Sequence, residues 1–92
     1  MSRPITHNAT AQRFELTEDG VLCVLDYEVF DGIMTITHTG VPRAVGGRGI
    51  AADLTRNALE TARNMRWTVR PQCSYAAGFI SRNPDYRDLV VN

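Results

Sequence analysis

Alternation of apolar and polar residues is the strongest signal in the first half of the chain. Apolar side chains occupy every second position from Val21 to Val29, which is the pattern of a strand with one buried face. Residues 13–17 alternate in the same way, and Glu18-Asp19-Gly20 separates the two runs as a turn. The pattern therefore predicts two antiparallel strands.

A third strand is predicted over residues 33–39. The Asp31-Gly32 pair before it is typical of a tight hairpin, and the residues that follow are rich in β-branched side chains. Strict alternation places Met34, Ile36 and His38 on one face of this strand and the residues between them on the other. The three runs together predict an antiparallel three-strand meander.

The second half of the chain has helical periodicity. Apolar residues recur at every third or fourth position, opposite a charged face. They are Ile50, Ala51, Leu54, Ala58, Leu59, Ala62 and Met65. A further strand is predicted over residues 67–72. Because a helix separates it from the strand at residues 33–39, the two strands are expected to be parallel and joined by a βαβ crossover. Residues 74–82 predict a C-terminal helix that ends before Pro84, and residues 85–91 a short amphipathic tail.

The length of 92 residues allows one small domain. Residues 1–10 have little periodicity and are expected to form a flexible lead-in, which leaves residues 11–92 as a single α/β domain. The first 14 residues lack the apolar core of a signal peptide, and no run approaches membrane-spanning length. We therefore expect a cytoplasmic protein that has no membrane partner.

Charge and cysteine content narrow the chemistry. Ten arginines balance ten acidic residues and the chain contains no lysine, which excludes a lysine Schiff base. The even balance predicts no broad nucleic-acid-binding surface. The two cysteines are far apart and have no CxxC motif or Cys/His cluster, so neither a disulfide framework nor a metal site is expected.

Three glycines lie between the third strand and the first helix, in Gly46-Gly47-Arg48-Gly49. Because glycine adopts positive φ at little cost, such a loop can turn its N–H groups toward an anion at the start of the helix. A P-loop is excluded because it requires a lysine. A dinucleotide fold is disfavoured because the chain has too few strands for a doubly wound sheet. A diphosphate site of another kind, or a turn that only joins strand to helix, remains open.

The stretch from His38 to Ala51 resembles motif A of the GNAT acetyltransferase superfamily. In that motif, Q/R-x-x-G-x-G/A, Gly49 and Ala51 supply the two specified small residues, and Gly46 stands where glutamine or arginine is usual. Similarity to the short single-domain GNAT-like branch extends over about residues 13–91. It is carried by His38-Thr39-x-Val41-Pro42, Arg70-Pro71-x-Cys73-x-Tyr75 and Asn83-Pro84-x-Tyr86. The resemblance implies a compact GNAT-like fold.

The resemblance also implies that acetyl-CoA is the co-substrate. Its pantetheine arm would lie between the third strand and the next parallel strand, and the N–H groups of the glycine loop would hold the pyrophosphate. The implied coenzyme-binding residues are Val41, Arg43, Gly46, Gly47, Arg48, Gly49, Ile50 and Ala51. Of these, Arg43 and Arg48 are expected to assist the phosphates electrostatically. Positions 40 and 43 are commonly glutamate and proline in that branch, so Gly40 and Arg43 depart from its pattern.

Three side chains are candidates for the transfer chemistry. Cys73 precedes a predicted helix, whose N-terminus together with Arg70 would favour the thiolate, and the branch has a cysteine here that is proposed to be catalytic. His38 is a candidate base or hydrogen-bond partner of the acyl group. Tyr75 lies where a GNAT enzyme often has its general acid. Each residue also has a structural interpretation. Cys73 could be a small buried apolar side chain, His38 an imidazole whose hydrogen bonds are purely structural, and Tyr75 an aromatic side chain packed between helix and sheet.

The sequence thus predicts an acetyl-CoA-binding N-acetyltransferase that acts on an unidentified amine. The chain has no residues to spare for the N-terminal helices that help to form the acceptor groove in larger GNAT enzymes, so a protein or peptide amine is as plausible as a small metabolite. A non-catalytic coenzyme A-binding sensor or interaction module is the alternative, and a purely structural domain is a third. A Cys73→Ala variant separates the first two, because it would lose turnover only in an enzyme.

Overall fold

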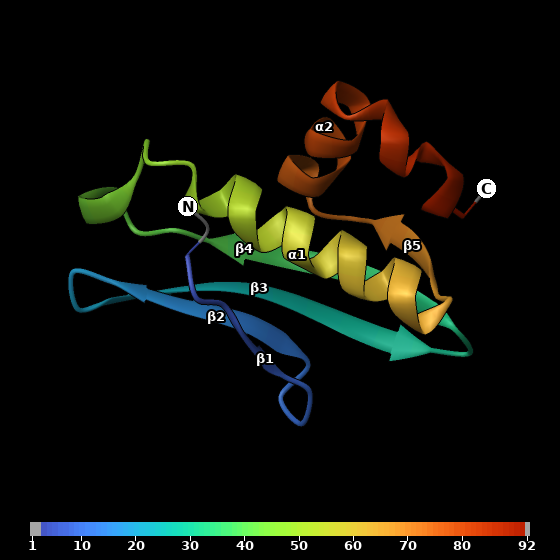
Figure 1. Ribbon diagram of the computed structural model, residues 1–92, viewed down its shortest axis with the longest axis horizontal. Coiled ribbons are helices and arrows are strands. Elements are labelled where there is room, and N and C mark those ends of the chain that lie inside the picture. The colour runs from blue at the N-terminus through green and yellow to red at the C-terminus, as the bar shows by residue number, and fades with distance from the viewer. Residues whose placement is uncertain (1–2, 92) are drawn as a thin grey trace.

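The computed structural model describes residues 3–91, in which five strands form one sheet in the order of the sequence (Figure 1). The strands are β1 (Thr6–Asn8), β2 (Arg13–Glu18), β3 (Val21–Phe30), β4 (Ile33–Gly40) and β5 (Thr68–Pro71). The helices are α1 (Ile50–Met65) and α2 (Ser74–Arg82), with short 3₁₀ helices at Arg43–Val45 and Pro84–Leu89. The first four strands are antiparallel, and β5 pairs parallel with β4. The predicted meander, crossover and C-terminal helix are therefore confirmed.

Two tight turns connect the long strands. Asp19 and Gly20 have φ of 51° and 75°, and Asp31 and Gly32 have φ of 55° and 75°. Positive φ at both central residues is the geometry of a two-residue hairpin that matches the twist of the strands. The two Asp-Gly pairs thus fix the register of β2, β3 and β4.

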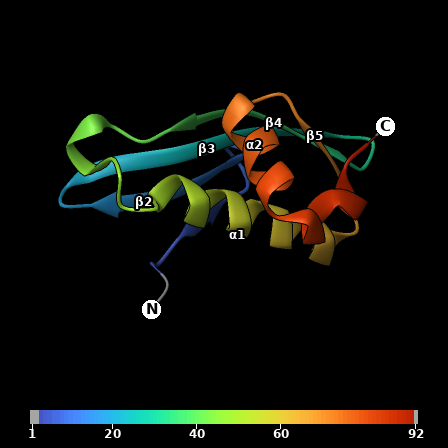
Figure 2. The same ribbon diagram turned by 90° about the horizontal axis from the view of Figure 1, so that it is seen from above.

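Helix α1 lies across one face of the sheet, as Figures 1 and 2 show, and encloses the core. From the sheet, alternate residues of β3 contribute Cys23, Leu25 and Tyr27, all buried, as the alternation predicts. From α1, the buried residues are Ile50, Leu54, Thr55, Ala58, Leu59 and Ala62. Met65 is predicted to belong to this face but is 56% exposed; it is the last residue of α1, beyond Ala62, the last buried position.

Over residues 3–10 the N-terminal segment differs from the lead-in expected over residues 1–10, of which the first two lie outside the described part of the chain. Thr6–Asn8 form β1, which pairs with β2 and adds a fourth antiparallel strand at the edge of the sheet. His7 of this strand stacks on Phe14 with ring centroids 4.2 Å apart. A strand of only three residues is too short to show a pattern of alternation.

A register shift interrupts β4. Ile36 lies opposite Tyr27, but His38 lies opposite Asp26, so Thr37 has no partner on β3. Residues directly opposite each other point to the same face of a sheet. The extra residue therefore turns His38 to the face of Asp26 and turns the following Thr39 to the core side, in the manner of a β-bulge. The predicted alternation of Met34, Ile36 and His38 on one face is wrong at His38 for this reason.

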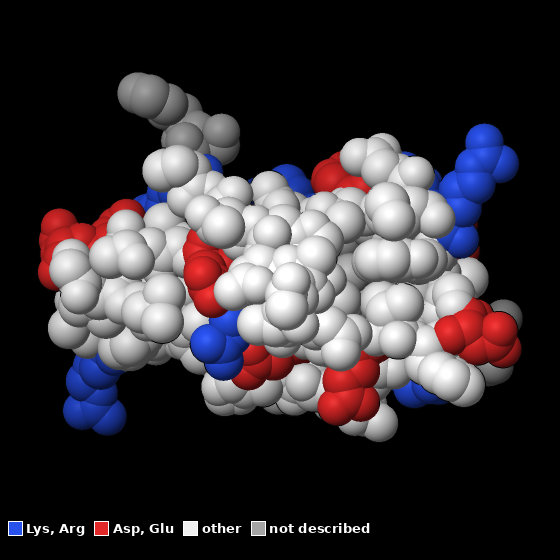
Figure 3. Space-filling model, turned by 90° about the horizontal axis from the view of Figure 1, so that it is seen from below, with Lys and Arg blue, Asp and Glu red and all other residues white. Residues whose placement is uncertain are grey.

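Charged side chains of both signs are scattered over the face of the molecule seen in Figure 3, without a continuous block of either sign. Within residues 3–91, the helices are too short or too polar to cross a bilayer.

Candidate functional site

The glycine loop leads directly into α1. Gly47 and Gly49 have φ of 77° and 82°, a region that residues with a Cβ rarely adopt. Gly46 instead has φ of −69°. The first backbone hydrogen bond of the helix runs from the Asp53 N–H to the Gly49 carbonyl, at 3.1 Å. The N–H groups of residues 50–52 therefore lie in the turn that has no partners within the helix, at the positive end of its dipole.

A cleft of about 360 Å³ opens along this loop. Its lining residues are Val41, Gly46, Gly47, Gly49, Ile50, Ala51, Ala52 and Tyr75. It brings together six of the eight residues that the sequence assigned to coenzyme binding, and adds Tyr75 from the first turn of α2. Sequence reasoning missed Ala52, although it directly follows the motif.

The two arginines expected to assist phosphates do not line this cleft. The Arg48 guanidinium pairs at 2.7 Å with Asp19, in the turn between β2 and β3, and at 3.3 Å with Glu18, the last residue of β2. Hydrogen bonds to these two carboxylates, that of Asp19 first, raise the pKa of Arg48. Arg43 is exposed in the 3₁₀ helix before the loop. Neither arginine side chain therefore contributes to the lining of the cleft.

Strands β4 and β5 separate beside the cleft. Their pairing ends at Ile36 and Pro71, and the last link is a 2.9 Å hydrogen bond from the Cys73 N–H to the Ile36 carbonyl. Within the described chain, the remainder of β4 is paired with no strand on this side, although it continues to Gly40. Cys73 therefore lies at the fork between the two strands.

The Cys73 thiol is half-buried at this fork, 3.5 Å from the hydroxyl of Thr39. Burial raises the pKa of the thiol. Hydrogen bonds from the Thr39 hydroxyl and from the backbone N–H groups of Ala76, Tyr75 and Thr39 lower it and together prevail, so the pKa lies below its ordinary value. By contrast, burial raises the pKa of the Cys23 thiol inside the core. The two cysteines are thus chemically distinct, and only Cys73 has the environment of a reactive thiol.

His38 lies on the other face of the sheet from Cys73, because of the bulge in β4. A Cβ built on Gly40 would lie 3.0 Å from Nε2 of His38 and 3.5 Å from a methyl group of Val24. The imidazole therefore occupies the space that a side chain at position 40 would need. The structure brings Cys73 and Tyr75 to the same side of β4, but it does not bring His38 to them.

A second hollow of about 420 Å³ lies on the His38 side of the sheet. It is lined by Arg13, Leu22, Val24, Gly40, Val41 and Pro42. Val41 borders this hollow and the glycine-loop cleft alike. The end of β4 thus separates two cavities that open on different faces of the molecule.

No metal-binding cluster of three or more His, Cys, Asp or Glu residues is present in the part of the chain that the structure describes.

Comparison with known proteins places the chain among acyl-transfer enzymes. Residues 13–89 match the family model described as GCN5-related N-acetyl-transferase. The solution structure of a GCN5-like candidate N-acetyltransferase from Staphylococcus aureus is similar, with a TM-score of 0.76 and 26% sequence identity. That similarity covers 100% of this chain and 92% of the other. None of the curated protein sequences compared with the chain matches it.

Proposed function

This chain belongs to the GCN5-related N-acetyltransferase family, and we propose that it binds acetyl-CoA in the glycine-loop cleft and transfers the acetyl group to an amine. The observation that carries the proposal is the position of Cys73. It lies at the fork of β4 and β5, while Tyr75, two residues later, lines the cleft that the glycine loop forms. A donor held along the loop and a reactive thiol at the fork are thus parts of one site.

The residues of the cleft suit a diphosphate attached to a flexible, largely apolar arm. Gly47 and Gly49, both with positive φ, lead into the start of α1, where the first N–H groups have no partner within the helix. Such N–H groups are suited to bind a pyrophosphate. Val41 and Ile50 supply apolar walls. The free edge of β4 beyond Ile36 offers backbone groups to the amides of a pantetheine arm. Arg43 is exposed just before the loop, whereas the guanidinium of Arg48 is held by Glu18 and Asp19.

Acetyl-CoA supplies an activated acetyl group as a thioester. In one route, Cys73 acts as the nucleophile: its sulfur forms a bond to the acetyl carbon, and the coenzyme thiol leaves with a proton. An amine then takes the acetyl group from Cys73 and restores the thiol. In the other route, the amine attacks the thioester directly, and Tyr75 or Cys73 supplies the proton to the leaving thiolate. Both routes place the Cys73 thiol beside the thioester, but only the first requires it as the nucleophile.

The hollow on the opposite face is the place we assign to the acceptor. Because Val41 borders both cavities, an amine in the hollow would reach the donor around Val41, at the end of β4. His38 faces the side of the hollow and lies beside Gly40, so it is positioned to accept a proton from the incoming amine. Since the hollow is open rather than enclosed by helices, the acceptor proposed is an accessible amine such as that of a protein or peptide.

Calorimetric titration with acetyl-CoA, followed by a thiol-release assay with a peptide amine, tests this function. We expect saturable binding, and repeated release of coenzyme A only when the amine is present. Without the amine, release should not exceed the one equivalent that acetylation of Cys73 gives. Cys73→Ala should still bind acetyl-CoA. It should release no coenzyme A by the first route, and by the second only if Tyr75 is the acid. Binding without release for every class of amine would instead support the coenzyme A-binding sensor, and absence of binding would contradict both functions.

A further inference from the structure

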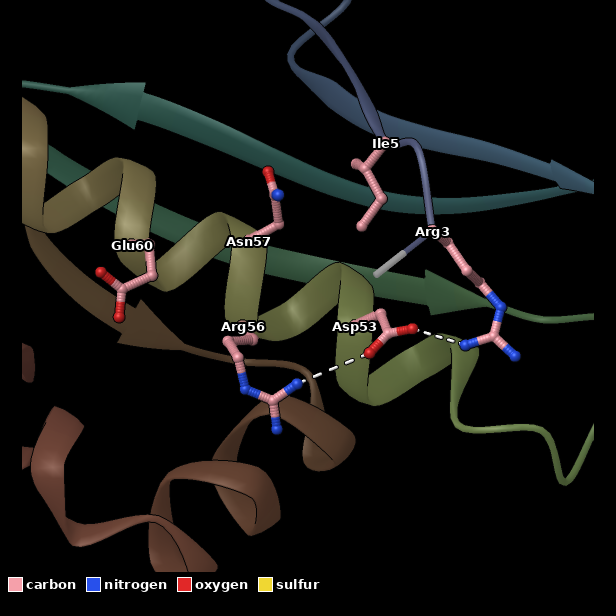
Figure 4. Close-up of a pocket in the computed structure, with 6 residues that line it drawn as sticks. All are labelled: Arg3, Ile5, Asp53, Arg56, Asn57 and Glu60. Atoms are coloured by element: carbon pink, nitrogen blue, oxygen red, sulfur yellow. Dashed lines mark hydrogen bonds and ion pairs between the residues drawn. The ribbon is translucent and has the colours of Figure 1, made fainter. Parts of the chain in front are cut away.

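Arg3 connects three parts of the chain that are far apart in sequence. Its Nε donates to Glu18 at 2.9 Å and its Nη1 to Asp53 at 2.5 Å. Its Nη2 donates to the backbone carbonyl of Arg48 at 2.7 Å. Figure 4 shows the Arg3 side chain extending from the N-terminal segment toward Asp53 on the first turn of α1. One guanidinium thus ties the N-terminal segment to the β2–β3 turn, the glycine loop and the helix that follows.

The carbonyl that Arg3 holds is at the centre of the glycine loop. Arg48 stands between Gly47 and Gly49, the two residues with positive φ. Glycines lose the most conformational freedom on folding, so a loop built from them needs contacts from outside to remain in one conformation. Because Arg3 fixes the backbone of Arg48 while Glu18 and Asp19 hold its side chain, both halves of this residue are restrained.

Both guanidinium groups of this cluster are already paired with carboxylates. The guanidinium groups of Arg3 and Arg48 face the carboxylates of Glu18, Asp19 and Asp53. The Arg3 side chain is 26% exposed, and its donors are directed at protein acceptors. Arg3 is therefore suited to shape the loop rather than to attract phosphates.

We propose that Arg3 is a positioning residue for the coenzyme site: it holds the glycine loop in the conformation that binds acetyl-CoA. This inference rests on the proposed function. The sequence predicts no role for the N-terminal segment. In this proposal the segment supports the coenzyme site, because Arg3 donates a hydrogen bond to the backbone carbonyl of Arg48. Loss of the contact leaves the loop free to sample conformations that do not bind, so the apparent affinity falls in proportion to the competent fraction.

The test compares Arg3→Gln with wild type and with Arg63→Gln. Arg63 is a matched control because it also joins a carboxylate, that of Asp88, and a backbone carbonyl, that of Asp85, but at the other end of α1. The measurements are the Kd for acetyl-CoA, the thermal midpoint, and the hydrogen-exchange rates of the amides of residues 47–49 without ligand. For R3Q we expect an about tenfold weaker Kd, the order of one lost charged hydrogen bond, and faster exchange in the loop.

The Arg63→Gln control shows the result expected if an arginine only stabilises the fold. R63Q should lower the thermal midpoint to a similar extent and leave both the Kd and the exchange of the loop unchanged. A Kd of R3Q within twofold of wild type overturns the proposal. Arg3→Lys provides a second variant if R3Q does not fold, because it keeps the charge but cannot reach three acceptors, and it should also weaken binding. If wild type itself does not bind, the proposed function fails, and this inference fails with it.

Discussion

The hydroxyl of Thr39 and the thiol of Cys73 lie 3.5 Å apart, although 34 residues separate them in the sequence. The bulge at Thr37 makes this contact possible, because it turns Thr39 to the core side of β4. The start of α2 then directs the N–H groups of Tyr75 and Ala76 toward the same sulfur. A bulged strand and a helix N-terminus together create the environment of the thiol.

Replacing Thr39 by valine should make Cys73 less reactive. The substitution keeps the shape of the side chain but removes the hydroxyl, which is the largest contact that lowers the pKa of the thiol. The pKa should therefore rise, the thiolate fraction at neutral pH should fall, and alkylation should slow. Rates of iodoacetamide labelling as a function of pH, read by mass spectrometry at each cysteine, measure this shift. Buried Cys23 serves as the internal control and should remain unlabelled in the folded protein. An unchanged pH profile at Cys73 would show that Thr39 does not influence the thiol.

Incubation with acetyl-CoA should add one acetyl group to wild-type protein if transfer proceeds through Cys73. The chain contains no lysine, so the common site of non-enzymatic acetylation is absent. Intact-mass analysis followed by peptide mapping locates the group. Cys73→Ala should gain no acetyl mass and still bind acetyl-CoA, whereas Cys23→Ala should gain it as wild type does. Acetyl-CoA-dependent turnover without any acetylated intermediate would favour the direct route.

The two positive-φ glycines should be far less tolerant of substitution than their neighbour. Gly49→Ala should destabilise the fold by about 1–2 kcal/mol, the cost of left-handed geometry in a residue with a Cβ. Gly46→Ala should change stability by less than about 0.5 kcal/mol, because its φ is −69° and the nearest atom to a new Cβ is 3.4 Å away. Urea unfolding measures both values. Equal losses would mean that the loop conformation does not depend on φ at position 49.

Acid should weaken the contacts that hold the glycine loop. A hydrogen bond from Arg3, followed by contacts with Arg48, lowers the pKa of Glu18. A carboxyl whose pKa is lower in the folded state contributes stability above its unfolded pKa, and this contribution is lost as the pH falls through the folded value. Titration of the Glu18 carboxyl by NMR should give a value below the ordinary range in wild type and a higher value in Arg3→Gln. A titration at the ordinary pKa in wild type would be incompatible with the observed ion pairs.

The sequence predicted those parts of the fold that depend on local patterns. Alternation in β3, the Asp-Gly turns and the 3.6-residue period of α1 each identify an element from neighbouring residues alone. The glycine loop was found for the same reason, because Gly47 and Gly49 stand directly before a helical run. Such signals depend on backbone conformation, which a few adjacent residues determine.

The features that the sequence did not predict depend on contacts between distant residues. The bulge that moves His38 to the other face is a property of the β3–β4 pairing and has no Gly or Pro to mark it. Arg3 contacts residues 15 to 50 positions away. Arg48 was expected to assist phosphates, but the β2–β3 turn brings Glu18 and Asp19 to its guanidinium. Tertiary packing alone decides these partners.

An NMR titration of backbone amides with acetyl-CoA tests the central claim most directly. The account predicts saturable shifts at Val41, at residues 46–52, at Cys73 and at Tyr75, the residues of the cleft and the fork. Amides at the far end of α1, around Arg63, should not move. If the loop amides remain unchanged at millimolar acetyl-CoA, the glycine-loop cleft is not the coenzyme site, and the proposed transfer chemistry fails.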